Sequence, residues 1–222
     1  MSNGFLNFLR PHKTVPLTPW TATSRWDLNP KRIFVLFFGL FIFGLGDSLL
    51  IQSSIGNAPW SVLAQGISNR LDITLGWSTF AISTVVLLLW IPLREKPGFG
   101  TISNIFIIAT AIQVGVSIFP TENNYVVSLA MVLIGIFMVG LGSALYITCG
   151  LGPGPRDGLM TALNIRTGVR IGRVRLGIEG TVLVLGALLG GTVGVGTLLF
   201  AGLIGQSIAI NLGVISRLTH RN

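Results

Sequence analysis

Long apolar stretches occupy most of this chain and restrict it to one kind of fold. Five of them are clear, and a sixth is interrupted by polar residues but is still long enough. Each can cross a hydrocarbon core of about 30 Å as an α-helix. They run over roughly residues 33–53, 75–93, 101–119, 125–149, 174–192 and 196–216. The chain is therefore predicted to be an all-α polytopic membrane protein with six transmembrane helices.

The composition excludes a soluble fold of this size. Half of the residues are hydrophobic, only 10% are charged, and the mean hydropathy is +0.76. The 29 glycines fit the same class, because small residues let helices approach closely in lipid. The net charge of +8 comes from few basic residues scattered among apolar spans, so we expect no nucleic-acid partner.

A sequence repeat runs through the membrane part at an offset of 96 residues. Gly-Leu-Gly at 44–46 returns at 140–142, and Ile-Gly-x-x-Pro at 55–59 returns as Leu-Gly-x-x-Pro at 151–155. A fixed period of this kind indicates a duplicated unit. Each unit holds three spans, an odd number, so the second copy must enter the membrane from the opposite side. We expect a 3+3 inverted repeat with the substrate site at the junction of the copies.

The repeat sets the expected domain boundaries. Residues 1–30 form a cytoplasmic N-terminal arm, 31–121 the first membrane repeat, 122–217 the second, and 218–222 a cytoplasmic tail.

Each predicted repeat also contains a short helix that cannot cross a membrane. These segments lie near 58–71 and 155–168, and each has helix-like apolar spacing. A helix of about 13 residues is only about 20 Å long. We expect both to lie in the interface or to dip into the membrane and return, protected by the other helices.

Basic residues predict the orientation. With the N-terminus inside, all of the 15 Lys and Arg residues except Arg70 face the cytoplasm, which the positive-inside rule favours. Trp60, Trp77 and Tyr125 are expected near the outer interface and Trp90 near the inner one. The predicted location is therefore the cell (inner or plasma) membrane, with both termini cytoplasmic.

The two Gly-x-x-Pro turns are the leading candidates for substrate binding. Each ends a long span with glycine and starts a short helix at proline, whose missing N–H costs nothing there. The free N–H groups at a helix start favour anions. Alternatively, glycine and proline serve only to make a tight turn. The candidate residues are Gly56, Asn57, Pro59, Gly152, Gly154, Pro155, Arg156 and Asp157.

Two carboxylates within apolar spans are candidates for ion coupling. Asp47 lies well inside the first span, and its repeat partner is Ser143. A lone ionised Asp there costs about 3 kcal/mol, so it should face the bundle interior as a proton or cation relay, or stay protonated and hydrogen-bond a neighbouring helix. Glu179, partnered by Ser83, follows Arg175 by one helical turn, so interfacial ion pairing is the alternative role.

The cytoplasmic loop of the second repeat collects several arginines. It could attract an anionic substrate, or close an inner gate through pairing of Arg156, Asp157 and Glu179. Alternatively, these charges only determine topology and contact anionic lipids.

A family resemblance rests on the second turn and on the glycines before each turn. Residues 150–160 contain Gly-Pro-x-Asp-Gly, and Gly-Leu-Gly precedes both turns at 44–46 and 140–142. This pattern resembles the bacterial YczE/YyaS/YitT-type membrane proteins, most of all the YczE-like branch, over about 31–217. The resemblance implies an integral membrane protein of a family often presumed to be transporters, with no established substrate. The first turn carries Trp60-Ser61 in place of Arg156-Asp157, so the two turns are not chemically equivalent.

These features predict a secondary transporter or permease for a small solute, with an anion as one candidate, bound between the two short helices. One alternative is an accessory or regulatory subunit that docks a membrane complex, or a second copy of the chain, through residues 1–30; a passive channel is another. We expect no enzyme, cofactor or metal site. The single Cys149 has no metal-ligand spacing, His12 and His220 lie in the polar ends, and nucleotide-binding and hydrolase motifs are missing.

Overall fold

The computed structural model describes residues 14–219, and the regular structure of this part is entirely α-helical. The helices are α2 (Pro30–Gln52), α3 (Pro59–Leu71), α4 (Leu75–Leu88), α5 (Trp90–Leu93), α6 (Phe99–Ile118), α7 (Tyr125–Thr148), α8 (Pro155–Thr167), α9 (Ile171–Leu188) and α10 (Val195–Thr219).

Five helical segments of the described part are long and apolar enough to cross a membrane. They are α2, the continuous pair α4 and α5, α6, α7 and α10. Five of the six predicted spans are thus confirmed as candidates, and the protein is a multi-pass membrane protein. The remaining predicted span coincides with α9, which carries Arg173, Arg175 and Glu179 within 18 residues. Because this charge makes α9 less apolar than the others, a sixth span stays a prediction.

The two short helices have the predicted length and start. α3 and α8 each contain 13 residues and begin at Pro59 and Pro155. Neither can span a membrane at about 1.5 Å per residue. Both end at a residue in the left-handed conformation, Asp72 after α3 and Gly168 after α8.

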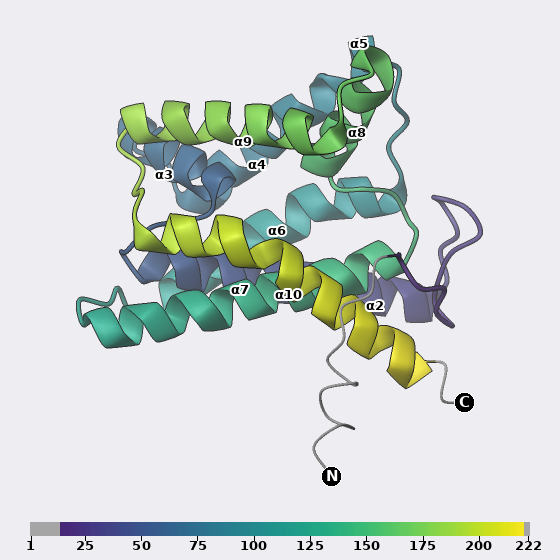
Figure 1. The fold of residues 1–222 in the computed structure, drawn as a ribbon, viewed down its shortest axis with the longest axis horizontal. Coiled ribbons are helices and arrows are strands. Elements are labelled where there is room, and N and C mark those ends of the chain that lie inside the picture. Colours follow the sequence, from purple (N-terminus) through teal and green to yellow (C-terminus); the bar gives the residue numbers. More distant parts are fainter. Residues whose placement is uncertain (1–13, 220–222) are drawn as a thin grey trace.

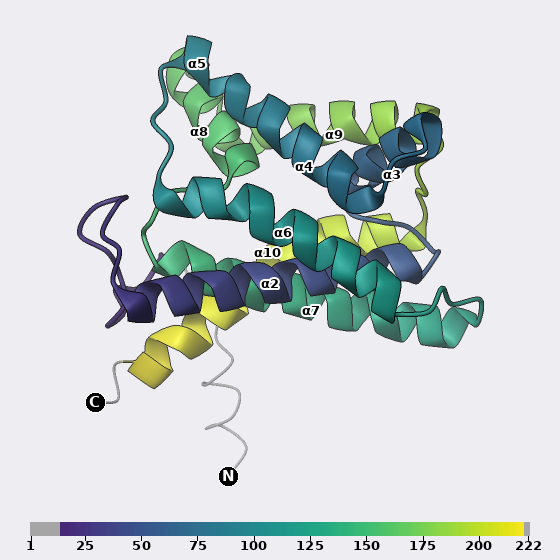
Figure 2. The ribbon, with the colours of Figure 1, turned by 180° about the vertical axis from the view of Figure 1, so that it is seen from behind.

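The helices form two groups that face one another across the molecule. In one group α2 packs on α6 and α7, and α7 packs on α10; in the other, α3 and α8 pack on both α4 and α9. Figures 1 and 2 show these groups from opposite sides, and α4 packs on α6 to connect them. The two short helices therefore lie within the helical bundle and not along its outer surface.

Glycines allow α2 and α7 to approach closely at two points. A Cβ added at Gly39 would lie 3.1 Å from the carbonyl oxygen of Gly142, and one added at Gly46 would lie 2.8 Å from that of Gly135. Small residues at such crossings let backbones pack together in lipid, where no hydrophobic effect drives helices together. These contacts make α2 and α7 the centre of their group.

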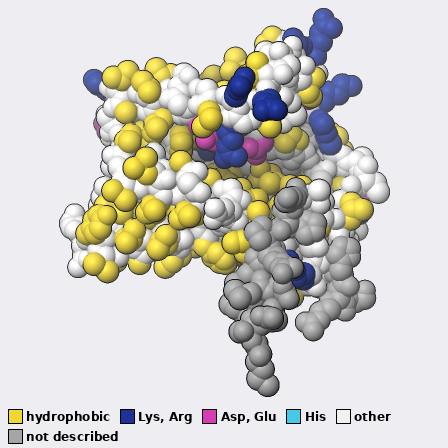
Figure 3. All heavy atoms as spheres, viewed as in Figure 1, with side chains coloured by type: hydrophobic (Ala, Val, Ile, Leu, Met, Phe, Trp, Pro, Cys, Tyr) yellow, Lys and Arg dark blue, Asp and Glu magenta, His cyan; other side chains and the backbone are white. Residues whose placement is uncertain are grey.

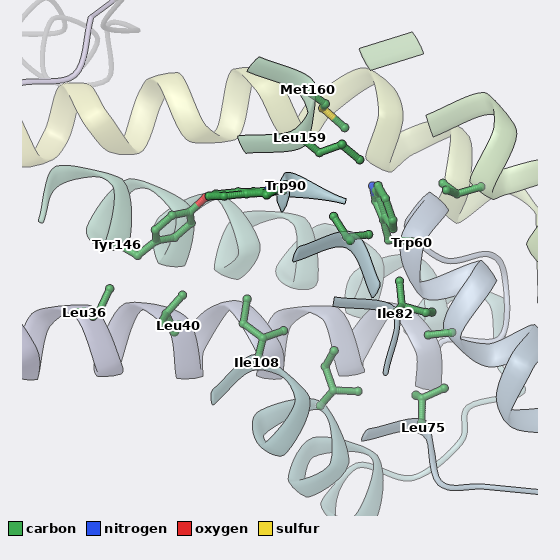
Figure 4. Packing of buried hydrophobic residues seen from close by; sticks show 14 of the residues in the cluster. Leu36, Leu40, Trp60, Leu75, Ile82, Trp90, Ile108, Tyr146, Leu159 and Met160 are labelled. Atoms are coloured by element: carbon green, nitrogen blue, oxygen red, sulfur yellow. The ribbon is translucent and has the colours of Figure 1, made fainter. Parts of the chain in front are cut away.

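Buried apolar side chains occupy part of the space between the groups. Trp60, Trp90 and Tyr146 lie in this core with Leu36 and Leu40 (Figure 4). The rings of Trp60 and Trp90 are buried, with 6% and 2% exposed, so they do not face lipid headgroups, and their depth near the two membrane interfaces stays a prediction. Trp90 begins α5 and Trp60 is the second residue of α3, and both rings pack inside the protein.

Large apolar side chains also cover much of the outer surface. Figure 3 shows them spread over α7 and α10. Phe34, Leu176 and Leu198 are among the most exposed. This distribution suits a surface that faces lipid.

The part of the predicted N-terminal arm that the structure describes packs on the protein's own helices. The indole N–H of Trp20 donates to Thr148 Oγ1 at 3.1 Å, and the N–H of Ala22 donates to the carbonyl of Cys149 at 2.9 Å. The second bond satisfies a backbone carbonyl at the C-terminal end of α7, where the carbonyls have no partner within the helix. Residues 1–13, where docking of a partner was predicted to begin, lie outside the described residues.

An ion pair steadies the end of this segment. Asp27 pairs with Arg32 and accepts a hydrogen bond from the Thr23 hydroxyl at 3.1 Å. Burial acts to raise the pKa of Asp27, but the hydrogen bonds from Thr23 and the Arg32 charge outweigh it and lower the pKa.

Candidate functional site

A cavity of about 330 Å³ lies between the two groups of helices. Side chains from α2, α3, α4, α6, α7, α8, α9 and α10 line it, and the first residues of both short helices, Pro59 and Pro155, are among them. Figure 3 shows acidic and basic side chains gathered in the hollow between α9 and α10. The cavity thus brings both proline-started turns to one place.

Asp47 of α2 lines this cavity beside the first turn of α3. Its side chain is almost fully buried, with 2% exposed. Carboxylate oxygen Oδ2 accepts a hydrogen bond from the Ser61 hydroxyl at 2.7 Å. The other oxygen, Oδ1, has no partner among the described residues. Leaving a buried polar atom unpaired is costly, so Asp47 marks a place where a proton or a ligand is expected.

Arg156, the second residue of α8, lies over the first turn of α3. Its guanidinium carbon is 4.9 Å from the centre of the Trp60 ring, a cation–π contact. With the described residues it forms neither a hydrogen bond nor an ion pair within 4 Å. Asp47, Asp157 and Glu179 are nevertheless near enough to interact with it electrostatically. The indole N–H of Trp60 also lacks a partner in this part of the chain.

The two other acids of the cavity are already engaged. The Tyr146 hydroxyl donates to Asp157 Oδ2 at 2.6 Å, and Arg175 Nε donates to Glu179 Oε1 at 2.9 Å. The second bond is the ion pair that the spacing of Arg175 and Glu179 predicts. The alternative prediction, a gate closed by pairing among Arg156, Asp157 and Glu179, is not formed in this structure, because both acids have other partners.

Trp90 holds the first turn of α8 in place. Its indole N–H donates to the carbonyl oxygen of Pro155 at 3.0 Å, and the Thr101 hydroxyl donates to that of Pro153 at 2.8 Å. The ring lies so close to α8 that a Cβ added at Gly158 would be 2.0 Å from its Cζ2 atom. The position of Arg156 thus depends on contacts from α5 and α6.

Seven of the residues that the sequence predicts for binding or coupling line the cavity together. They are Asp47, Pro59, Gly154, Pro155, Arg156, Asp157 and Glu179.

Three other predicted binding residues lie outside the cavity lining and support the turns. Gly56 and Gly152 have φ angles of 123° and 110°, which L side chains rarely adopt. A Cβ at Gly56 would also lie 2.6 Å from the backbone nitrogen of Gly194. The Asn57 side chain donates to Gln65 Oε1 at 2.8 Å. These contacts agree with the alternative prediction, in which the residues of the turns serve only to form the turns.

Tyr146 and Asn104 line the cavity but were not predicted from the sequence. Their positions in the other repeat hold Leu50 and Phe200. The sequence signal that could have found them is a polar residue in one repeat at a position where the other repeat, 96 residues away, has an apolar residue. The same comparison did identify Asp47 and Glu179.

No group of three or more His, Cys, Asp and Glu side chains that could hold a metal ion occurs within residues 14–219.

The fold and the cavity define a polytopic helical membrane protein with charged groups enclosed beside two short helices. The chain belongs to a family of unknown function, DUF6198, whose sequence model matches residues 30–212. This membership agrees with the predicted resemblance to YczE- and YyaS-type proteins.

Three relatives cover most of the chain. An uncharacterized protein of Haemophilus influenzae is 44% identical over 208 residues, which are 94% of this chain and 95% of that protein. The uncharacterized membrane protein YczE of Bacillus subtilis is 32% identical, covering 79% of this chain and 83% of YczE. The uncharacterized protein YyaS of the same organism is 31% identical, covering 81% and 91%. No solved structure matches the chain.

Proposed function

We propose that this protein is a secondary transporter of the bacterial plasma membrane for a small solute with an anionic group, and that it is not an enzyme. One observation carries the proposal: the starts of α3 and α8 meet at a cavity inside the bundle that also holds the unpartnered Oδ1 of Asp47. Interrupted or short helices that meet inside a bundle are the usual substrate site of secondary transporters.

Contacts that recur between the two halves support an inverted repeat. The N–H of Gly100 donates to the carbonyl of Leu151 at 2.8 Å, and the N–H of Gly196 donates to that of Ile55 at 2.9 Å. Each bond joins one repeat to the other, and shifting either by 96 residues gives its counterpart. The α2–α7 glycine contacts exchange in the same way. A two-fold axis between the copies accounts for this exchange.

A sixth span through α9 and cytoplasmic termini complete the proposed topology. Arg173 and Arg175 lie at the first turn of α9, where the positive-inside rule places cytoplasmic charge. The rest of the helix, from 180 to 188, is apolar apart from Thr181. On this topology the Gly56–Pro59 turn belongs to the outer half of the protein and the Gly152–Pro155 turn to the inner half.

One difference in packing between the halves supports alternating access. α4 packs closely on α6, whereas their counterparts α9 and α10 make no comparable contact. Gly172 has no atom of another element within 4 Å of an added Cβ, while its counterpart Gly76 packs on Gln113 of α6. The cavity is open between α9 and α10 in this conformation. The opposite conformation closes α9 on α10 and releases α4 from α6.

Asp47 is the proposed coupling residue, with Glu179 in a secondary role. Only the first repeat has an acid at this position, so a proton or cation bound there breaks the symmetry of the two halves. Glu179 is less suited to coupling here because Arg175 already neutralises it.

Flux into liposomes tests the proposal. The purified full chain is reconstituted and tested with labelled amino acids, carboxylates and phosphate under imposed proton or sodium gradients. We expect a gradient to drive at least one solute, and Asp47→Asn to abolish that response. Asp72→Asn, at an exposed position after α3, should transport like the wild type. If no solute responds to either gradient and Asp47→Asn changes nothing, the chain is not a coupled carrier.

A further inference from the structure

Two groups of opposite charge are left without partners in the same cavity. Asp47 has a free carboxylate oxygen, and the Arg156 guanidinium has only the Trp60 ring beneath it. Of the other acids of the cavity, Asp157 accepts a hydrogen bond from Tyr146 at one carboxylate oxygen, and Glu179 pairs with Arg175. A ligand that completes this cavity therefore has to offer one positive and one negative group.

Asp47 and Arg156 are neighbours that do not neutralise one another directly. They interact electrostatically, yet no guanidinium nitrogen of Arg156 lies within 4 Å of a carboxylate oxygen of Asp47. Separated charges in a buried site are costly unless something lies between them. Their arrangement suits a molecule that carries both charges a short distance apart.

Neutral groups in the cavity lining can also contact the two charged ends of such a molecule, some beside Arg156 and others elsewhere in the cavity. The indole N–H of Trp60 has no partner and lies beside Arg156, where it can donate to an acid group together with the guanidinium. Ser83 and Ser143 line the same cavity and can accept from an amino group. The start of α8 at Pro155 adds the partial positive charge of a helix N-terminus near Arg156.

The size and the remaining lining restrict the molecule further. About 330 Å³ is at the low end of the range for small-molecule sites. Apolar side chains, among them Ile108, Val139 and Ile204, form much of the remaining wall. The cavity therefore accommodates a compact molecule with a short apolar body.

We propose that the cavity binds a small zwitterionic amino acid, with its ammonium group at Asp47 Oδ1 and its carboxylate at Arg156 and the indole N–H of Trp60. This assignment rests on the proposed transport site and names its substrate class. It also explains why the cavity keeps an acid and a base apart: each contacts one end of the same molecule.

Binding to the purified full chain in detergent tests the assignment with matched compounds. Glycine, alanine and valine carry both charges, whereas propionate lacks the amino group of alanine and ethylamine lacks its carboxylate. Isothermal titration calorimetry should show binding of at least one of the three amino acids. Propionate and ethylamine should each bind about tenfold more weakly or not at all, since each leaves one buried charge unpaired.

Matched variants locate the two ends of the ligand. Asp47→Asn and Arg156→Gln should each weaken amino acid binding by about tenfold or more. Asp72→Asn and Arg166→Gln, at exposed positions on or beside the same short helices, should bind like the wild type. Trp60→Phe keeps the ring under Arg156 but removes the N–H, and should weaken alanine while leaving ethylamine unchanged.

The outcomes separate this inference from the transport proposal. Propionate binding as tightly as alanine, or none of the three amino acids binding, overturns the zwitterion assignment even where liposomes show driven flux of another solute. Alanine bound through Asp47 and Arg156 without any flux supports the assignment and overturns transport.

Discussion

At the scale of single residues, the two repeats place an acid and a hydroxyl at exchanged positions. In the first repeat Asp47 accepts a hydrogen bond from Ser61. The corresponding positions of the second repeat hold Ser143 and Asp157, and Asp157 takes its hydrogen bond from Tyr146 instead. One acid is thus buried on a long helix, while the other is exposed at the start of a short one. Because of this exchange, the two halves of the cavity differ in where their acid lies.

We expect the hydrogen bond from Tyr146 to hold Asp157 away from Arg156. Tyr146→Phe removes the 2.6 Å hydrogen bond and frees the carboxylate to pair with the neighbouring guanidinium. We expect the affinity for amino acids to fall about tenfold, while the unfolding free energy falls by only about 1 kcal/mol, the usual net value of one hydrogen bond. Calorimetric titration and thermal unfolding in detergent measure the two effects.

The double variant Tyr146→Phe/Asp157→Asn is the control for this prediction. It removes the competing charge, so affinity should recover toward the wild-type value. Affinity that stays equally low in the double variant would show that Tyr146 acts on the ligand directly or on the fold.

At the scale of helices, the short elements were predictable and their surroundings were not. Glycine before proline after a long apolar span predicts the start of α3 and of α8, because proline is favoured at the first helical position. The contacts of Trp90 with α8 join residues 65 apart in the chain. No local pattern indicates such a contact, so the burial of the Trp90 ring against α8 could not be predicted.

Gly158 is required by this contact between α5 and α8. Gly158→Ala would place a methyl group against the Trp90 ring and displace the turn that carries Arg156. We expect a loss of about 1–3 kcal/mol in stability from overpacking, together with weaker amino acid binding. Thermal unfolding and titration of the detergent-solubilised protein measure both.

Gly177→Ala is the matched control on α9. An added Cβ there meets nothing within 4 Å, and the corresponding residue of the first repeat is already Ala81. Removing glycine from a helix interior should raise stability by about 0.5–1 kcal/mol. Equal destabilisation by both substitutions would show that the Trp90 contact does not restrict α8.

At the scale of the whole molecule, the class of fold followed from composition and span length, and most of the site followed from comparing the copies. Asp47 and Glu179 were found as mismatches between repeats, whereas Tyr146 and Asn104 were missed for want of the same comparison. The separation of α9 from α10 could not be predicted, because a repeated sequence favours equal packing in both halves.

The central claim is that the cavity opens to one side at a time, and a reversible cross-link tests it most directly. Gly76 and Gln113 bring α4 against α6, and the positions 96 residues later are Gly172 on α9 and Ala209 on α10. Cysteines at these two positions, with Cys149 replaced by serine, should come within disulfide distance only when α9 closes on α10.

Flux through liposomes is measured with this double-cysteine protein before oxidation, after oxidation and after reduction, with each single-cysteine variant as the control. The account predicts that the disulfide forms and stops driven flux, and that reduction restores the flux. The single-cysteine variants should transport throughout. A disulfide that never forms, or flux that continues unchanged once it has formed, would contradict alternating access.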